Sequence, residues 1–228
     1  MRRTLVIMAK APIPGQVKTQ LCPPLGERSA ALLYESFIRD TIEKASSVPD
    51  AEVVVAYTPR GTVSYFHETA PNADRYLLQK GSGLGERMSS CFERLSDSRR
   101  SVVITGADSP TLPARCLELA FDVLDTDRAD VVFGPASDGR CYLVGLRAPA
   151  PDLFEDVIWT GPNAASSSAR RARQMGLRVH MLPEWYDVTR PADLAHLRAE
   201  LLDSTVANHV SARHTRERMR SFVERGLL

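Results

Sequence analysis

The sequence has no excess of charge of either sign, no paired cysteine motif and no long hydrophobic run. Its 228 residues include 29 Lys and Arg against 28 Asp and Glu, a formal net charge of +1. A chain without a strongly positive field is not expected to bind nucleic acid. The four cysteines lie far apart and form no C-x-x-C motif, which excludes a zinc knuckle and a thioredoxin-like motif.

The hydrophobic stretches are also too short for export or membrane insertion. The apolar run near the N-terminus, Leu5 to Met8, is shorter than the core of a signal peptide, and no other run could span a bilayer. We therefore predict a cytoplasmic protein with reduced thiols and no membrane partner. A hydrophobic content of 43% and a charged content of 25% are typical of one globular domain at this length.

Short β-type runs alternate with amphipathic segments along most of the chain. Strands are expected over 5–8, 51–57, 75–79, 101–105, 129–133, 141–146 and 177–182. Helices are expected over 27–44, 84–95, 114–125 and 192–202. This alternation predicts an α/β fold with a mostly parallel twisted sheet and helices on both faces. We place the main domain at residues 1–203 and interpret residues 204–228 as an appended basic helical tail.

The first loop that could carry chemistry follows the first expected strand. Ligands of open α/β sheets bind where strands end, so each such loop is a candidate site. Gly15 lets the backbone approach a ligand, and Lys10 and Lys18 can reach phosphate oxygens. The spacing is not that of a Walker A motif, which argues against a P-loop ATPase. A proline-stiffened turn with solvated lysines is the alternative interpretation.

The second loop directly follows the strand expected over 101–105 and reads Gly106-Ala-Asp108-Ser-Pro110. Asp108 is well located to coordinate Mg²⁺ or Mn²⁺ that bridges phosphates. Its alternative role is to cap the next helix, but too many residues intervene before that helix begins. Asp108 is therefore predicted to be a metal ligand.

The third loop places Asp138-Gly139 between two expected strands, which is the usual signal of a tight hairpin. Asp138, Arg140 and Tyr142 would add an acceptor, a phosphate-binding fork and a stacking ring to that hairpin. Near the end of the chain, Thr189 and Asp193 suit the capping of the last helix. Asp187 has no such structural explanation.

Five of these segments resemble, in order, one bacterial family, and the resemblance covers about residues 4 to 200. The motifs are Met8-Ala-Lys-Ala-Pro-x-Pro-Gly-x-Val-Lys-Thr19, Gly85-Glu-Arg-Met88, Gly106-Ala-Asp108-Ser-Pro110, Gly134-Pro-Ala-x-Asp-Gly139 and Asp187-Val-x-x-Pro-x-Asp-Leu194. Together they resemble the GT-A-like selenodomain-associated transferase (glycosyltransferase) family. That family looks related to 2-phospholactate guanylyltransferase and to the molybdenum-cofactor and sugar nucleotidyltransferases.

The resemblance implies a Rossmann-like GT-A fold that binds a nucleoside triphosphate or a nucleotide sugar together with a small-molecule acceptor. The implied nucleotide-binding residues are Ala9, Lys10, Ala11, Pro12, Gly15, Lys18, Gly83, Gly85 and Arg87. On the acceptor side, the resemblance implies Asp138, Gly139, Trp159 and Thr160, and the hairpin loop itself adds Arg140 and Tyr142 as predicted acceptor-binding residues. The resemblance implies that Asp108 holds Mg²⁺ or Mn²⁺, and we predict Asp187 as a second metal ligand. The predicted catalytic residues are Asp108, Asp138 and Lys18.

Three positions depart from the family pattern. Gln20 stands where the family usually has an arginine, and Arg140-Cys141 stands where it usually has Gly-Tyr. Thr189 stands where relatives carry a second metal-binding aspartate. We expect Asp187 to compensate, with its carboxylate and that of Asp108 converging on one cation.

Three functions therefore stay open. Glycosyl transfer, slightly favoured by the resemblance, would use Asp138 as general base. Nucleotidylyl transfer to a phosphorylated or phosphonate acceptor would need mainly a metal and cations, such as Lys18 and Arg140. A non-catalytic nucleotide-binding module is the third, because Gln20 and Thr189 remove family features. A monomer or homodimer is expected.

Overall fold

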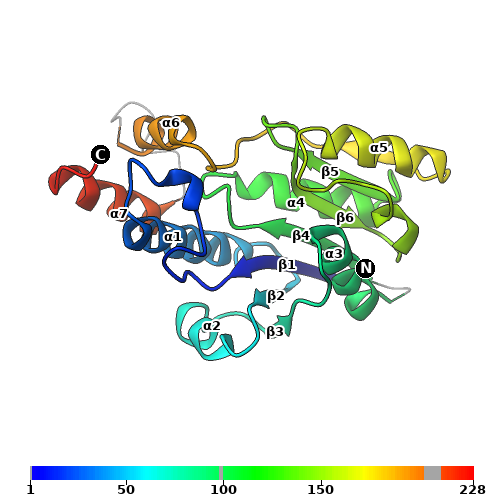
Figure 1. Ribbon diagram of the computed structural model, residues 1–228. Coiled ribbons are helices and arrows are strands. Elements are labelled where there is room, and N and C mark those ends of the chain that lie inside the picture. Colours follow the sequence, from blue (N-terminus) through cyan, green and yellow to red (C-terminus); the bar gives the residue numbers. More distant parts are fainter. Residues whose placement is uncertain (1, 98–99, 203–211) are drawn as a thin grey trace.

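The computed structural model describes residues 2–97, 100–202 and 212–228 (Figure 1). The strands are β1 Arg2–Lys10, β2 Ala51–Thr58, β3 Arg75–Leu78, β4 Arg100–Gly106, β5 Val131–Pro135, β6 Cys141–Leu146 and β7 Val179–Met181. The helices are α1 Glu27–Ala45, α2 Val63–Thr69, α3 Leu84–Leu95, α4 Ala114–Asp125, α5 Ala164–Gln174, α6 Pro191–Leu202 and α7 Arg213–Glu224. Two short 3-10 helices are η1 Thr19–Leu21 and η2 Pro151–Phe154.

The strands form one sheet in the order β3-β2-β1-β4-β6-β5-β7. Neighbouring strands pair in parallel except around β6, which is antiparallel to both β4 and β5. The predicted mostly parallel sheet is therefore confirmed. The carboxyl ends of β1, β4 and β5 consequently lie along one edge, together with the turn that joins β5 to β6.

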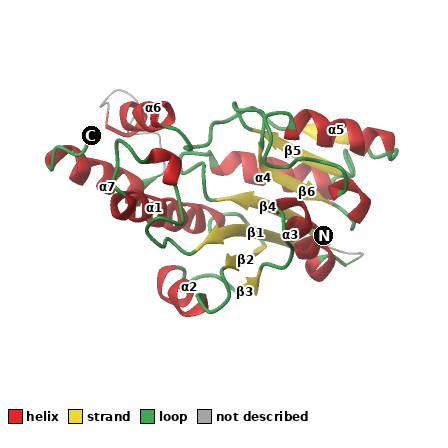
Figure 2. Cartoon of the chain, viewed as in Figure 1, coloured by secondary structure: helices red, strands yellow, loops and turns green. Residues whose placement is uncertain are grey.

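Both faces of the sheet are covered by helices (Figure 2). In β1, Leu5 and Ile7 belong to the core cluster that includes residues of α1 and α4, whereas Val6 belongs to the opposite cluster with residues of α3 and α5. This alternation follows from the twofold side-chain period of a strand. A strand buried on both faces needs a continuous apolar run, which is why β1 and β2 were readable from the sequence.

Most predicted elements occur where the sequence placed them, and α3, α4 and β6 have the predicted bounds. Two helices, α2 and α5, were not predicted. α2 has seven residues, too few for a helical period to stand out. α5 buries mainly alanines, Ala165, Ala169 and Ala172 among them, so its apolar stripe is weak beside its serines and arginines.

The C-terminal helix α7 lies beside α1 (Figure 1). Met219 and Phe222 are fully buried in the core cluster that also holds α1. The domain boundary predicted at residues 203 and 204 lies outside the described residues. In the described ranges, no helix is both long and apolar enough to cross a membrane.

Candidate active site

A cleft of about 550 Å³ opens where β1 and β4 end. Among the predicted site residues, it is lined by Lys10, Lys18, Asp108, Asp138, Arg140 and Thr160. A smaller cavity of about 160 Å³ shares Asp108, Arg140 and Thr160 with the cleft and adds Tyr142, Trp159 and Asp187. The structure thus brings together side chains from the first loop, the Asp108 loop, the hairpin and the late motif.

Lys18 is a buried ammonium and not a solvated one. Its side chain is 6% exposed, and its Nζ lies 2.7 Å from Asp108 Oδ1 and donates to the carbonyl oxygen of Val188 at 2.6 Å. The Nζ also lies 5.4 Å from the ring centroids of Tyr34 and Phe37, close enough for cation–π attraction. The interpretation of the first loop as a turn with solvated lysines is therefore wrong for Lys18.

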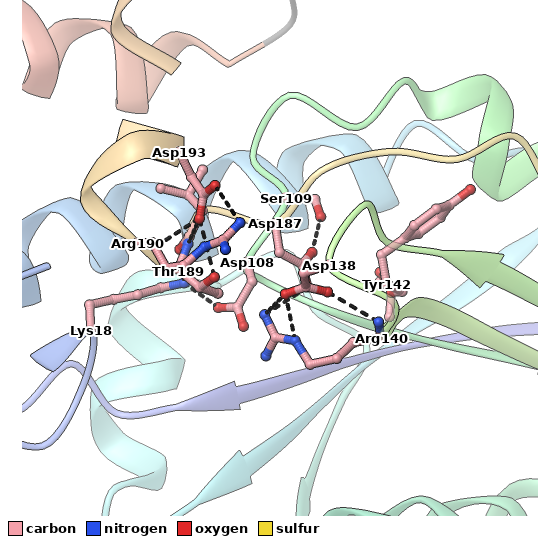
Figure 3. Close-up of polar contacts among 12 residues, drawn as sticks. Lys18, Asp108, Ser109, Asp138, Arg140, Tyr142, Asp187, Thr189, Arg190 and Asp193 are labelled. Atoms are coloured by element: carbon pink, nitrogen blue, oxygen red, sulfur yellow. Dashed lines mark hydrogen bonds and ion pairs between the residues drawn. The ribbon is translucent and has the colours of Figure 1, made fainter. Parts of the chain in front are cut away.

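The Asp108 loop and the late motif lie side by side, as Figure 3 shows. The amide of Val188 donates to the carbonyl oxygen of Asp108 at 2.8 Å, and Ser109 Oγ donates to Asp187 Oδ1 at 2.5 Å. Burial and the charge of Asp108 raise the pKa of Asp187, although the Ser109 hydrogen bond, Arg140 and Lys18 oppose the shift. Two carboxylates therefore repel each other across the small cavity.

Arg140 joins the hairpin to Asp187. Its Nε and Nη2 lie 2.8 and 2.6 Å from Asp138 Oδ2, and its Nη2 lies 3.5 Å from Asp187 Oδ2. Burial opposes ionisation of Asp138, but the hydrogen bonds and charge of Arg140, with the charge of Arg190, hold the pKa of Asp138 below its ordinary value. An aspartate held in this way is a weak base.

The hairpin turn itself is tightly packed. The amide of Ala136 donates to the carbonyl oxygen of Arg140 at 2.8 Å, and Gly139 has a φ of +84°. A Cβ at Gly139 would lie 1.7 Å from the carbonyl oxygen of Pro162. The predicted hairpin is therefore confirmed, and its glycine is required both by backbone conformation and by the neighbouring segment that carries Thr160.

The late motif caps α6, as expected. Asp193 Oδ2 accepts hydrogen bonds from the amides of Thr189 and Arg190, at 3.0 and 2.7 Å, and from Thr189 Oγ1 at 3.2 Å. Thr189 nevertheless also lines the cleft. Its hydroxyl is therefore held by a neighbouring carboxylate at the rim of the site.

Several predicted nucleotide-binding residues lie away from the two cavities. Gly15 faces the Glu27 carboxylate, and Arg87 Nε donates back to the carbonyl oxygen of Gly81 at 3.0 Å. A Cβ on Gly85 would lie 2.7 Å from Trp159 Cδ1, so the indole ring covers this glycine. In the described structure, neither cavity is lined by the predicted residues Gly15, Gly85 and Arg87. The same holds for five further predicted residues, Ala9, Ala11, Pro12, Gly83 and Gly139.

Trp159 and Tyr142 line the small cavity mainly as buried aromatic rings. Trp159 is 5% exposed and its ring stacks on Phe154, with centroids 5.2 Å apart. Tyr142 is 3% exposed, and its hydroxyl donates to the carbonyl oxygen of Pro183 at 2.8 Å. Thr160, by contrast, lines both cavities and is exposed, so it is accessible to a ligand.

Several residues of the site were not predicted from the sequence, among them Tyr34, Ser109 and Arg190. Tyr34 lines both cavities, although its position in the apolar stripe of α1 indicated only a core residue. Ser109 and Arg190 stand within recognised motifs, next to Asp108 and Thr189. Their polarity was the available signal, but spacing alone does not tell which neighbour of a motif aspartate faces the cavity.

A separate acidic group lies between α1 and α7. Ligand atoms of Asp40, Glu43 and His214 all lie within 4.8 Å of one another, a spacing that a metal ion could bridge. Both oxygens of Asp40 already accept hydrogen bonds from the first turn of α7. This group is therefore explained as a helix cap supplied by another helix.

Comparison with known proteins identifies the family. Residues 41–161 match the family described as "Uncharacterized protein conserved in bacteria (DUF2064)". The chain belongs to this family. A search of curated proteins finds no match.

Solved structures with the same fold are numerous. A candidate nucleotide-diphospho-sugar transferase from Desulfovibrio desulfuricans G20 is 28% identical, with a TM-score of 0.86 over 98% of this chain and 96% of that one. CMP:2-keto-3-deoxy-manno-octonic acid synthetase complexed with CTP is 14% identical, with a TM-score of 0.57 over 87% and 98%. Rv0371c from Mycobacterium tuberculosis H37Rv, in complex with manganese, is 16% identical, with a TM-score of 0.50 over 86% and 97%.

These similarities confirm the predicted GT-A-like fold. The similarity to the Desulfovibrio protein extends over nearly the whole of both chains, so this DUF2064 member and that protein share one architecture throughout. The Desulfovibrio protein is described as a transferase, and two more distant neighbours are described as a synthetase and a synthase. They agree with the prediction that this chain is an enzyme of the transferase class.

Proposed function

We propose that this DUF2064 protein is a nucleotidylyltransferase, which joins the nucleoside monophosphate part of a nucleoside triphosphate to a small phosphorylated or phosphonate acceptor. The observation that carries the proposal is the charge arrangement of the cleft. Lys10, Lys18, Arg140 and Arg190 line it together with Asp108 and Asp138. Cations therefore outnumber carboxylates on its wall, which suits two anionic substrates.

The reaction needs cations more than it needs a base. An oxygen of the ionised acceptor attacks the α-phosphorus, a bond between that oxygen and phosphorus forms, and the bond to the bridging oxygen of the β-phosphate breaks. Pyrophosphate leaves with the electron pair, and no proton has to be removed from the acceptor. Positioning and charge stabilisation then supply most of the rate enhancement.

The first loop is proposed to bind the triphosphate. Lys10 Nζ donates to the carbonyl oxygen of Gln16 at 2.9 Å and has no carboxylate partner among the contacts of the described structure, so its charge is available to phosphate. Gln16 and Gln20 add amide groups on the same side of the cleft. Lys18 is proposed to hold Asp108 in place and to add its charge to the phosphate site.

The hairpin side is proposed to bind the acceptor. Arg140 and Thr160 line both cavities, and the Asp138 carboxylate orients the Arg140 guanidinium. A guanidinium held in one plane by a carboxylate is prepared to bind a phosphate or a phosphonate with its remaining N–H groups.

Asp108 and Asp187 fit a divalent metal. Both line the small cavity, Asp108 is 37% exposed towards the cleft, and the repulsion between them is what a cation would relieve. Hard cations such as Mg²⁺ and Mn²⁺ favour such carboxylate oxygens. When bound, the metal would neutralise phosphate charge in the transition state.

Glycosyl transfer is the second candidate, supported by the similarity to the candidate nucleotide-diphospho-sugar transferase. It would need a general base near the acceptor hydroxyl. The contact of Asp138 with Arg140, which keeps its pKa low, argues against that role for the residue predicted to fill it. Membership of the selenodomain-associated transferases and a monomeric or homodimeric state remain predictions.

A ligand screen tests the proposal. The melting temperature is measured with each nucleoside triphosphate and with nucleotide sugars, with and without Mn²⁺, because a ligand that binds the native state stabilises it. Each triphosphate that stabilises the protein is then incubated with phosphorylated and phosphonate acceptors, and pyrophosphate is measured. Stabilisation by nucleotide sugars alone would favour glycosyl transfer. Stabilisation by triphosphates without turnover of any acceptor would favour a binding module.

A further inference from the structure

Lys44, near the end of α1, is a buried charged residue with no place in the chemistry described above. Its side chain lies away from both cavities, and the residue is 6% exposed. Its Nζ donates to the carbonyl oxygen of Pro110 at 2.9 Å, although the two residues are 66 positions apart. An ammonium is costly to bury, so packing alone does not explain a lysine here.

Pro110 belongs to the loop that carries the proposed metal ligand. Asp108 and Ser109 precede it directly, and these residues contact Lys18 and Asp187 on the cleft side. Lys44 contacts the same loop at Pro110 and lines neither cavity. The loop is therefore held between two lysines, one at the cleft and one in the core.

Asp40 lies one helical turn before Lys44 and is 3% exposed. It accepts hydrogen bonds from the amides of His214 and Thr215, at 2.9 and 2.8 Å, and from Thr215 Oγ1 at 2.5 Å. The Asp40 carboxylate also attracts the Lys44 ammonium. Polar groups of Thr215 in α7, of Asp40 and Lys44 in α1, and of Pro110 in the Asp108 loop thus follow one another through the core. Figure 1 shows α1 and α7 side by side.

We propose that Lys44 is a positioning residue, which fixes the Asp108 loop through the Pro110 carbonyl and has as a nearby opposite charge the Asp40 carboxylate, which is hydrogen-bonded to the C-terminal helix α7. The proposal rests on the proposed function, in which Asp108 and Asp187 hold a divalent cation. It assigns a role to α7, which packs against α1. Lys44 touches no substrate in this scheme and acts through the loop.

The test uses the full chain with three substitutions. Lys44→Met removes the ammonium and keeps most of the side-chain volume, whereas Ile38→Val alters a fully buried residue of the same helix and serves as the control. Thr215→Val removes one hydrogen bond to Asp40 and replaces Lys44→Met if that variant does not fold. Hydrogen exchange is measured in peptides covering residues 107–117, and Mn²⁺ affinity is measured by electron paramagnetic resonance.

Lys44→Met is expected to speed exchange in the loop by about tenfold, since a hydrogen bond from a charged donor is lost, and to weaken Mn²⁺ binding by a similar factor. Thr215→Val is expected to change both by about threefold and Ile38→Val to change neither. Unchanged exchange, or faster exchange with unchanged Mn²⁺ affinity, would overturn the positioning role. If the wild-type protein binds no Mn²⁺, the proposed metal site fails, and the exchange rates alone then decide whether Lys44 holds the loop.

Discussion

The ammonium of Lys18 lies 2.7 Å from Asp108 Oδ1, and both side chains reach this contact from loops that follow different strands. Lys18 has a φ of 51°, in the left-handed region that a residue with a Cβ seldom adopts. The same ammonium donates to the carbonyl oxygen of Val188. Three segments far apart in the sequence are therefore joined at one charged group, and the conformational cost of the first loop is offset there.

Asp108→Ala should abolish metal-dependent nucleotide binding, with Mn²⁺ affinity falling by at least about tenfold. It should also lower the free energy of unfolding by about 1–3 kcal/mol, because the buried Lys18 ammonium loses its carboxylate. Asp108→Asn keeps an oxygen for Lys18 and should retain more of the stability. Calorimetry with Mn²⁺ and denaturant titration measure the two effects, and unchanged metal affinity in both variants would remove Asp108 from the metal site.

Lys18→Met should weaken triphosphate affinity by about 1–3 kcal/mol and destabilise the fold as well, since Lys18 fixes two loops. Lys80→Met is the matched control, because Lys80 is exposed and lies outside the cleft. Its titration and unfolding curves should match those of the wild type. Equal behaviour of the two variants would mean that the Lys18 contacts contribute nothing to binding.

Thr189→Asp should tighten Mn²⁺ binding, because it adds an anionic oxygen at the rim of the cleft. The gain should come with a loss of stability of about 1 kcal/mol, since Thr189 donates to Asp193 and an aspartate there would repel it. Asp193→Asn in the same chain should recover part of that loss. Mn²⁺ titrations of the single and double variants test this, and unaltered affinity in both would show that position 189 does not reach the cation.

Gly139→Ala should destabilise the protein by about 2–4 kcal/mol, because a Cβ would collide with the Pro162 carbonyl oxygen at a positive φ. Gly61→Ala is the control. Gly61 also has a positive φ, of +87°, but a Cβ there would meet nothing within 4 Å, so about 1 kcal/mol is expected. Equal losses in denaturant titrations would mean that the contact with Pro162 is relieved at no cost.

Lys44 should make stability depend on pH above neutrality. Burial lowers the pKa of Lys44 from 10.5 to about 8, although Asp40, Cys116 and Glu200 oppose the shift. The unfolded chain therefore binds more protons between these values, and the unfolding free energy should rise with pH, by about 2 kcal/mol between about pH 7.5 and 9.5.

Buried thiols and tyrosines with raised pKa values act in the opposite direction at high pH. The quantity to compare is therefore the difference in unfolding free energy between the wild type and Lys44→Met at each pH. This difference should change across the interval in favour of the wild type as pH rises. A constant difference would show that Lys44 keeps an ordinary pKa in the fold.

The sheet was predictable because its strands are buried on both faces and so appear as continuous apolar runs, as Val53 to Ala56 do in β2. Asp108, Asp138 and Arg140 were predictable as residues of the candidate site because each lies in a loop that follows a strand end. The partners of these residues were not predictable. Lys18 is buried against Asp108, and Lys44 reaches Pro110 from α1. Both contacts depend on how loops and helices pack around the sheet, which the periodicity of the sequence does not indicate.

Because β6 runs antiparallel to β4 and β5, one side of the cleft is built by a hairpin turn and the other by loops that follow the parallel strands β1 and β4. The turn at Asp138 to Arg140 is a hairpin end, so side chains can be exchanged there without changing the pairing of β1 with β4, although Arg140 also contacts Asp187. If the hairpin side binds the acceptor, as proposed, acceptor selectivity can be altered at this turn while the strands that carry the proposed nucleotide side keep their pairing. A library confined to this turn, sparing Gly139 and Arg140, would sample new acceptors while keeping the proposed donor site.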